Sequence, residues 1–328
     1  ATFTYNGKSW ELTSGELVYL EGDPAYIPHV YYAPNYKWEA GKLVLKEGKA
    51  AGTDEYIEGN ARITGNGETI TVSFAEATRK YSRLRIATLP NEQITVDTEY
   101  FTPAGSSDME QNGNYTLTSD EKGNAYLYGT FENNSEVTVK YREAALTTYT
   151  FSQATESAKS YALDATVISA NSAEEIKSAI EQKVADGKTT IRLNLAPNAG
   201  TNEFMAIREA IKGAAPNDLG TIELTIIGVE TIPEEAFYKM LQLKSVRMSD
   251  VKEIKKYAFK ECQYLTVVEA PSLNKLYSGA FKKCDQLSKL TFGPINYADE
   301  RNWPIFEYIT PNIDLILSDY QKEMIETD

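Results

Sequence analysis

The sequence is poor in the residues on which most metal and nucleophile chemistry depends. Its 328 residues include two cysteines, Cys262 and Cys284, and one histidine, His29. Two cysteines exclude a disulfide-rich small scaffold and a four-cysteine zinc site. Because there is neither a second histidine nor a Gly-x-Ser-x-Gly motif, acyl transfer and metalloprotease chemistry have no starting point. We therefore expect a protein without cofactor, metal or catalytic residues.

Long apolar runs are absent, and basic residues are outnumbered. No stretch of about 18 apolar residues occurs, so the sequence predicts no membrane-spanning helix. The chain has 33 Lys and Arg against 47 Asp and Glu, which gives a formal net charge of −14. A surface with this charge repels phosphate backbones, so nucleic acid is not an expected partner.

The first ten residues contain neither an initiator methionine nor a charged and then apolar leader. We interpret the start at Ala1 as the result of removing an export signal or a lipid-anchor segment, although a chain trimmed for another reason would look the same. The expected location is outside the cell, at the cell surface or the outer membrane, and the expected state is a monomer.

The C-terminal third contains an internal repeat of 22 residues. Three segments, which start at Val229, Val251 and Leu273, align without a gap, and their apolar positions recur in register. Such a period predicts a solenoid, in which stacked turns close a core that no single turn can bury. The recurring phenylalanines are Phe237, Phe259 and Phe281.

The second and third repeats share the core Ala-Phe-x-x-Cys-x-x-Leu, at residues 258–265 and 280–287. This core resembles the BspA-type leucine-rich repeats, whose hallmark is the same motif in a repeat of this length. The first copy has Met240 in place of the cysteine, a soft apolar substitute that leaves the fold unchanged. Since Cys262 and Cys284 are one turn apart with both side chains directed into the core, we predict two buried free thiols.

The solenoid is predicted to begin before the clear repeats. Residues 172–188 and 201–214 read as amphipathic helices, each followed by a strand, and Ser172 with Glu175 forms a capping-box pattern at the first helix. After Pro294 the period ends, and residues 313–325 supply a last strand and a charged cap. The predicted solenoid domain is therefore 169–328.

The N-terminal half has a different pattern, with short alternating strands separated by turn signals. Gly65-Asn66-Gly67 and Glu121-Lys122-Gly123-Asn124 are placed where hairpins are expected to turn. Pro90 interrupts the pattern, so we predict two antiparallel β-sandwiches, 1–90 and 91–168. The predicted fold class is multidomain, with N-terminal all-β sandwiches followed by an α/β leucine-rich-repeat solenoid.

The order of features in this half is similar to that of the fimbrillin-like proteins of Bacteroidetes. These features are TYNGKSWEL, the tyrosine-rich HVYYAP, EYIEGNARITG, ETITVSF, KYSRLRI and SAKSYALDATV. The resemblance implies an extracellular, often lipid-anchored surface protein built from two such domains. Some members of that family polymerise, but here a solenoid follows the two domains, which argues against polymerisation.

The predicted binding surface is the strand face of the solenoid, where outward side chains alternate with the buried ladder. Its partner would be a protein or glycan on a host or neighbouring cell. The row mixes charges and has no large aromatic residue, so it lacks the usual hot-spot composition. The predicted contact residues are Glu223, Thr225, Ser245, Arg247, Val267, Glu269, Lys289 and Thr291.

A glycan-binding surface in the N-terminal half is the alternative function. Aromatic rings stack on sugar rings, although tyrosines on a strand more often pack in a core or at an edge. The candidate residues are Tyr26, Tyr31, Tyr32, Tyr36 and Trp38. Paired carboxylates such as Asp54 with Glu55 and Glu58, or Glu234 with Glu235, could serve a glycosidase, but we interpret them as a solvated acidic face.

Overall fold

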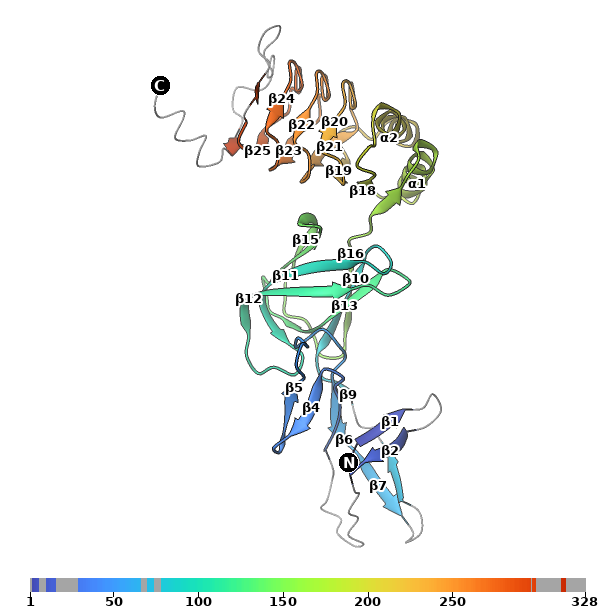
Figure 1. Cartoon of the computed structure of the whole chain (residues 1–328), viewed down its shortest axis with the longest axis vertical. Coiled ribbons are helices and arrows are strands. Elements are labelled where there is room, and N and C mark those ends of the chain that lie inside the picture. Colours follow the sequence, from blue (N-terminus) through green and yellow to red (C-terminus); the bar gives the residue numbers. More distant parts are fainter. Residues whose placement is uncertain are drawn as a thin grey trace, which may run out of the picture.

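The computed structural model describes residues 2–5, 10–15, 29–65, 70–73, 78–295, 297–298 and 314–316. The described elements are mostly β-strands, with two helices, and they form three parts along the long axis of the molecule (Figure 1). Small N-terminal sheets lie at one end, a seven-stranded sheet lies in the middle, and the stacked turns of the C-terminal part lie at the other end. Neither described helix combines the length and apolar composition needed to cross a bilayer.

The N-terminal part consists of small antiparallel sheets. In the hairpin β4–β5, Ala40 and Gly41 have φ values of 49° and 81°, the left-handed pair typical of a tight two-residue turn. The pairs are β1 (Thr2–Tyr5) with β2 (Trp10–Ser14), β4 (Tyr36–Glu39) with β5 (Lys42–Leu45), and β7 (Arg62–Gly65) with β8 (Ile70–Ser73). A three-stranded sheet joins β3 (His29–Tyr32), β6 (Ile57–Asn60) and β9 (Thr78–Arg79).

The middle part is a single curled sheet in the order β15-β14-β11-β13-β10-β16, with β12 paired to β11. Its strands alternate buried and half-buried residues and enclose one core, in which Phe101 and Phe131 stack 4.4 Å apart. The strands are β10 (Ser82–Ala87), β11 (Gln93–Pro103), β12 (Glu110–Thr118), β13 (Asn124–Phe131), β14 (Glu136–Tyr141), β15 (Ala144–Thr150) and β16 (Ser160–Asp164).

Two features of this sheet differ from the expectations. The turn at 121–124 exists, with Gly123 at φ 76°, but it does not close a hairpin, because β12 pairs with β11 whereas β13 pairs with β10 and β11. The prediction of a hairpin there was wrong, since local turn chemistry does not determine which strands pair. In addition, β10 precedes Pro90 yet pairs with β13 and β16, so any division of the N-terminal half has to fall before Ser82.

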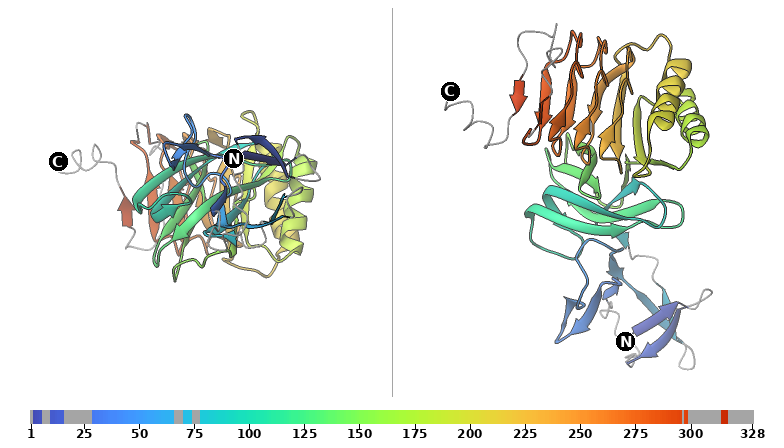
Figure 2. Two further views of the ribbon diagram at one scale, coloured as in Figure 1. Left: turned by 90° about the horizontal axis from the view of Figure 1, so that it is seen from below. Right: turned by 45° about the horizontal axis from the view of Figure 1, so that its top comes forward.

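The C-terminal part is a parallel solenoid. One sheet has the order β17-β18-β19-β21-β23-β25-β27, and the opposite wall has the order β20-β22-β24-β26. Helices α1 (Ala173–Ala185) and α2 (Thr201–Ala214) lie at one end of the stack (Figure 2, right). The first sheet contains β17 (Ile168–Ala170), β18 (Thr190–Leu195), β19 (Ile222–Ile227), β21 (Leu243–Arg247), β23 (Val267–Ala270), β25 (Lys289–Phe292) and β27 (Asp314–Ile316). The second contains β20 (Thr231–Ile232), β22 (Glu253–Ile254), β24 (Lys275–Leu276) and β26 (Tyr297–Ala298).

The start of helix α1 follows from the local sequence. The Ser172 side chain accepts the backbone N–H of Glu175, as the capping-box pattern predicts, while the Glu175 carboxylate accepts the N–H of Asn171 instead of that of Ser172. Residues 313–325 contain the expected last strand as β27, and the proposed cap beyond it lies outside the described residues.

The 22-residue period sets the packing of the solenoid. Phe237 stacks on Phe259 at 5.0 Å and 19°, and Phe259 stacks on Phe281 at 5.3 Å and 9°. At the helical end, Phe204 of α2 meets Phe237 edge-on at 5.6 Å, so the helix continues the ladder. All of these rings are fully buried and form the main column of the repeat core.

The two cysteines belong to the same core. Cys262 donates its S–H to the carbonyl of Phe237, and Cys284 donates to the carbonyl of Phe259, each at 3.0 Å. Both are buried free thiols, which confirms the prediction. Burial raises the pKa of Cys262 to about 12, so the side chain acts as a small apolar residue with a weak donor.

The solenoid is joined to the middle sheet by a specific contact. Arg192 of β18 is only 6% exposed, and its Nε donates to the carbonyl of Leu146 in β15 at 2.6 Å. Ile227, at the end of β19, belongs to the same buried cluster as the core of the middle sheet. The first strands of the solenoid are therefore seated on the middle sheet.

Candidate functional site

The predicted strand-face row exists with the predicted register. Glu223 lies beside Ser245, and Thr225 lies beside Arg247, as expected for residues one 22-residue period apart. The next strands continue both columns. Ser245 is followed by Val267 and Lys289, and Arg247 is followed by Glu269 and Thr291. All eight residues therefore share one face of four neighbouring strands.

The two columns are not equally accessible. Thr225 is 3% exposed and Ser245 is 8% exposed, although both occupy outward positions. Thr225 stands beside Arg192 in the sheet, and Arg192 is the residue that bonds the carbonyl of Leu146. The middle sheet thus covers the beginning of the row, and the later part, from Arg247 onward, is the part that a partner can reach.

Charges along the accessible row are paired with one another. The Nε of Arg247 is 2.8 Å from Oε2 of Glu269, and the Nζ of Lys289 is 3.7 Å from Oε1 of the same carboxylate. Exposed pairs of this kind contribute about 0–1 kcal/mol to stability. The row therefore presents two cations around one anion on three neighbouring strands. Substitution of any one of these three residues should change the free energy of unfolding little.

The N-terminal aromatic residues divide into accessible and structural ones. Tyr31 is 40% exposed and Trp38 is 63% exposed, and their rings lie 6.1 Å apart with a tilt of 34°. Tyr36 is half-buried and donates its hydroxyl to the carbonyl of Ala104 at 2.9 Å, so it anchors the hairpin to the middle sheet. Tyr32 is exposed on the same strand, β3, and Tyr26 lies outside the described residues.

Polar side chains surround the Tyr31–Trp38 pair. The ring of His29 packs edge-on against Tyr31 at 4.7 Å, and its Nε2 lies 3.9 Å from the carboxylate of Glu58. Lys80 donates to Glu58 at 2.6 Å. Burial opposes ionisation of Glu58, but hydrogen bonds from Lys80 and Tyr56 lower its pKa overall. The site offers exposed rings beside both donors and acceptors.

Sequence reasoning found no partner for His29, because the partner comes from another strand. Antiparallel pairing of β3 with β6 places Tyr31 opposite Glu58 and His29 opposite Asn60. The structure also shows the partners of the acidic residues Glu55 and Glu58. Arg79 binds Glu55 through two hydrogen bonds of 2.6 and 2.8 Å, and Glu58 accepts from Lys80 and Tyr56. Both carboxylates are therefore ion-paired and hydrogen-bonded, as structural acids are.

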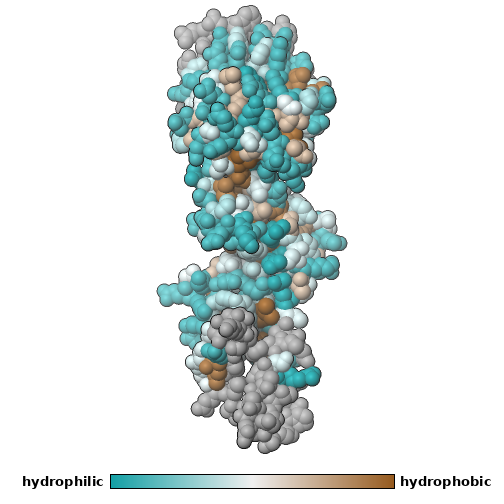
Figure 3. Space-filling view, turned by 90° about the vertical axis from the view of Figure 1, so that its right-hand side faces the viewer, coloured by the Kyte–Doolittle hydropathy of each residue, from teal (hydrophilic) through white to brown (hydrophobic). Residues whose placement is uncertain are grey.

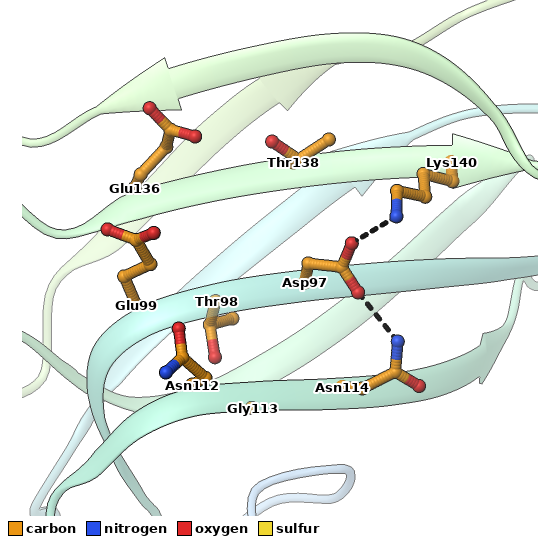
Figure 4. A pocket seen from close by; sticks show the side chains of 9 residues that line it. All are labelled: Asp97, Thr98, Glu99, Asn112, Gly113, Asn114, Glu136, Thr138 and Lys140. Carbon is orange, nitrogen blue, oxygen red and sulfur yellow. Dashed lines mark hydrogen bonds and ion pairs between the residues drawn. The ribbon is translucent and has the colours of Figure 1, made fainter. Parts of the chain in front are cut away.

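A shallow hollow of about 490 Å³ lies on the middle sheet, between β11, β12 and β14 (Figure 4). Asp97 is held there by Lys140 at 2.5 Å and by Asn114 at 2.6 Å. Glu99 and Glu136 project from neighbouring strands nearby. Among the described residues no group of three or more potential metal ligands comes together, so the hollow has no metal-site donor set in this part of the chain.

Residues 219–310 match the family described as BspA type Leucine rich repeat region (6 copies). The match confirms the predicted BspA-type leucine-rich repeats within residues 219–310. A solved structure, the crystal structure of a T. pallidum leucine rich repeat protein, is 22% identical, with a TM-score of 0.24 over 30% of this chain and 53% of that chain. The match thus spans about half the length of that protein. No curated protein matches the chain.

Proposed function

We propose that this protein is a non-catalytic surface protein that binds a macromolecule of a host or neighbouring cell through the strand face of its solenoid. The match to a BspA-type repeat region supports a binding role. The observation that favours this face is the exposed cluster of Arg247, Glu269 and Lys289, which spans three adjacent strands. A parallel sheet holds these charges at fixed spacings, so a partner whose opposite charges have the same spacing can form an ion pair with each of them.

The proposal includes the setting of the protein. Export to the cell surface, a lipid anchor and a fimbrillin-like N-terminal half belong to this proposal, and the mostly β-strand structure of the described residues before 169 is consistent with β-sandwich domains. In this proposal the N-terminal sheets and the middle sheet serve as a stalk that carries the solenoid. Because β10 pairs with the middle sheet, the proposed boundary between the two N-terminal domains moves from position 90 to before Ser82.

The direct experiment measures binding of the whole chain to intact cells and to immobilised extracellular-matrix proteins. Arg247→Ala is expected to weaken binding at least about fivefold while the free energy of unfolding changes by no more than about 1 kcal/mol. Lys252→Ala is the matched control, because Lys252 is similarly exposed and forms a comparable pair, 2.6 Å, with Glu230, away from the row. Equal binding by wild type and Arg247→Ala would remove the strand face from consideration.

A second candidate function is glycan binding at the Tyr31–Trp38 pair. Two neighbouring exposed rings beside His29 and Glu58 combine a stacking surface with hydrogen-bonding groups, which is the composition that sugar recognition requires. A glycan array probed with wild type and with Trp38→Ala tests it. Tyr100→Ala, at an exposed tyrosine of the middle sheet, is the control. Unchanged array signals with Trp38→Ala would exclude this site.

A further inference from the structure

The solenoid has a second surface that the strand-face proposal does not use. The turns that follow β20, β22 and β24 stack in register, since Phe237 N donates to Ala258 O at 2.7 Å and Phe259 N donates to Ala280 O at 2.8 Å. Equivalent residues of successive turns therefore form columns. Figure 1 shows these turns at the top of the solenoid, on its side away from the middle sheet. The tyrosine–lysine ridge of these turns consists of Tyr238, Lys239, Lys256, Tyr257, Lys260 and Lys283.

Tyrosine rings contact three of the ridge ammonium groups, those of Lys239, Lys256 and Lys260. Lys260 lies over two rings, 5.3 Å from that of Tyr238 and 4.7 Å from that of Tyr257. Lys256 lies 4.8 Å from the Tyr257 ring. The Tyr257 ring itself crosses Gly279, where an added Cβ would come within 2.5 Å of it. A cation–π contact positions an ammonium group but leaves its full positive charge in place.

Several lysines elsewhere on the solenoid lie beside close carboxylates. Lys244 lies 2.8 Å from Glu223, and Lys252 lies 2.6 Å from Glu230. The Glu253 carboxylate forms ion pairs with both Lys255 and Lys275. These short pairs cover the strand face and the wall formed by β20, β22 and β24. Charge on those surfaces is balanced locally.

The ridge lacks that balance. Among the described residues, the one carboxylate within 4.0 Å of its lysines is Glu261, at 3.4 Å from Lys239 and 3.9 Å from Lys260. Helix α2 adds two cations at the ridge end, because Arg208 donates to the carbonyl of Glu235 and Lys212 donates to that of Tyr238. Burial lowers the pKa of Lys212, and the nearby charges of Arg208 and Lys239 lower it further. The first turn also carries the exposed carboxylates of Glu234 and Glu235, so the excess positive charge lies on the second and third turns of the ridge and at the α2 end, on a chain whose formal net charge is −14.

We propose that the tyrosine–lysine ridge binds a linear anionic polysaccharide that carries sulfate groups. Stacked turns are about 4.8 Å apart, so the ridge offers a row of fixed cations to a polymer with regularly spaced anions. A polysaccharide is favoured over a single-stranded nucleic acid because the Tyr257 ring contacts two lysine ammonium groups and lies over Gly279, so it is poorly placed to stack on a base.

Heparin, as a sulfated polysaccharide probe, is titrated into the whole chain at several salt concentrations by isothermal calorimetry. The double variant Lys256→Gln, Lys260→Gln is expected to bind at least about tenfold more weakly and with a shallower salt dependence. The control is the double variant Lys252→Gln, Lys275→Gln, which removes two paired lysines outside the ridge and is expected to stay within about twofold of wild type. Unchanged melting temperatures show that each variant is folded.

Several results would overturn the proposal. These are equal heparin affinity in wild type and the ridge variant, an equal loss in the ridge and control variants, and single-stranded DNA binding as tightly as heparin. Desulfated heparin is expected to bind far more weakly, and tight binding of it would also contradict the proposal. Arg247→Ala tests the strand face separately. This variant is expected to retain heparin binding, so a failure of the strand-face proposal can be distinguished from a failure of the ridge proposal.

Discussion

Replacement of Phe259 by alanine tests how the repeat core is held together. Phe259 is fully buried and stacks between Phe237 at 5.0 Å and Phe281 at 5.3 Å. Loss of a buried phenylalanine costs about 3–5 kcal/mol. We expect the upper half of that range, because two ring contacts of about 0.5–1.5 kcal/mol each are lost. The backbone ladder also holds the adjacent turns at a fixed spacing, so the cavity cannot collapse.

The assay is calorimetry together with urea unfolding of the whole chain. A loss of about 4 kcal/mol corresponds to a fall of about 8–16 °C in the solenoid transition. Phe292→Ala is the matched control, because Phe292 lies at the far end of the stack, 6.1 Å from Phe281, and should cost distinctly less. A loss below about 1 kcal/mol for Phe259→Ala would refute the stacked-ladder reasoning. One common transition with the middle sheet would contradict the predicted domain boundary at residue 169.

Three further predictions concern the same part of the chain. Cys262 and Cys284 should resist alkylation at pH 8 in the folded chain, because burial raises the pKa of Cys262 to about 12, and mass spectrometry should find both alkylated after denaturation without reductant. Gly279→Ala should cost about 1–3 kcal/mol in urea unfolding, because its Cβ would meet the Tyr257 ring and because the φ of 64° strains a non-glycine residue; only the ring-contact part of the loss should disappear in a Tyr257→Ala background. Two lysines hydrogen-bond Glu253 and lower its pKa, so its contribution is present above the ordinary value of about 4.3 and is lost as the pH falls through the lowered pKa. The stability difference between wild type and Glu253→Gln should therefore narrow in acid, and a difference independent of pH would contradict this.

Local and periodic features of the structure were predictable from the sequence. The 22-residue period by itself predicts Glu223 beside Ser245 and Arg247 beside Glu269, because stacked turns repeat one backbone path. The cap at Ser172 followed from side-chain chemistry within four residues. Both inferences need only neighbouring residues or a translation along the chain.

Contacts between distant segments were decided by the tertiary structure alone. No local signal shows that Arg192 reaches the carbonyl of Leu146, so the burial of Thr225 at an outward position could not be foreseen. Likewise, His29 acquires Glu58 as a neighbour only when β3 pairs with β6. The sequence by itself therefore determined the solenoid and its columns of residues. Long-range strand pairing and the seating of the solenoid on the middle sheet determined which of those residues remain open to a partner, because such contacts depend on the whole fold and have no period in the chain.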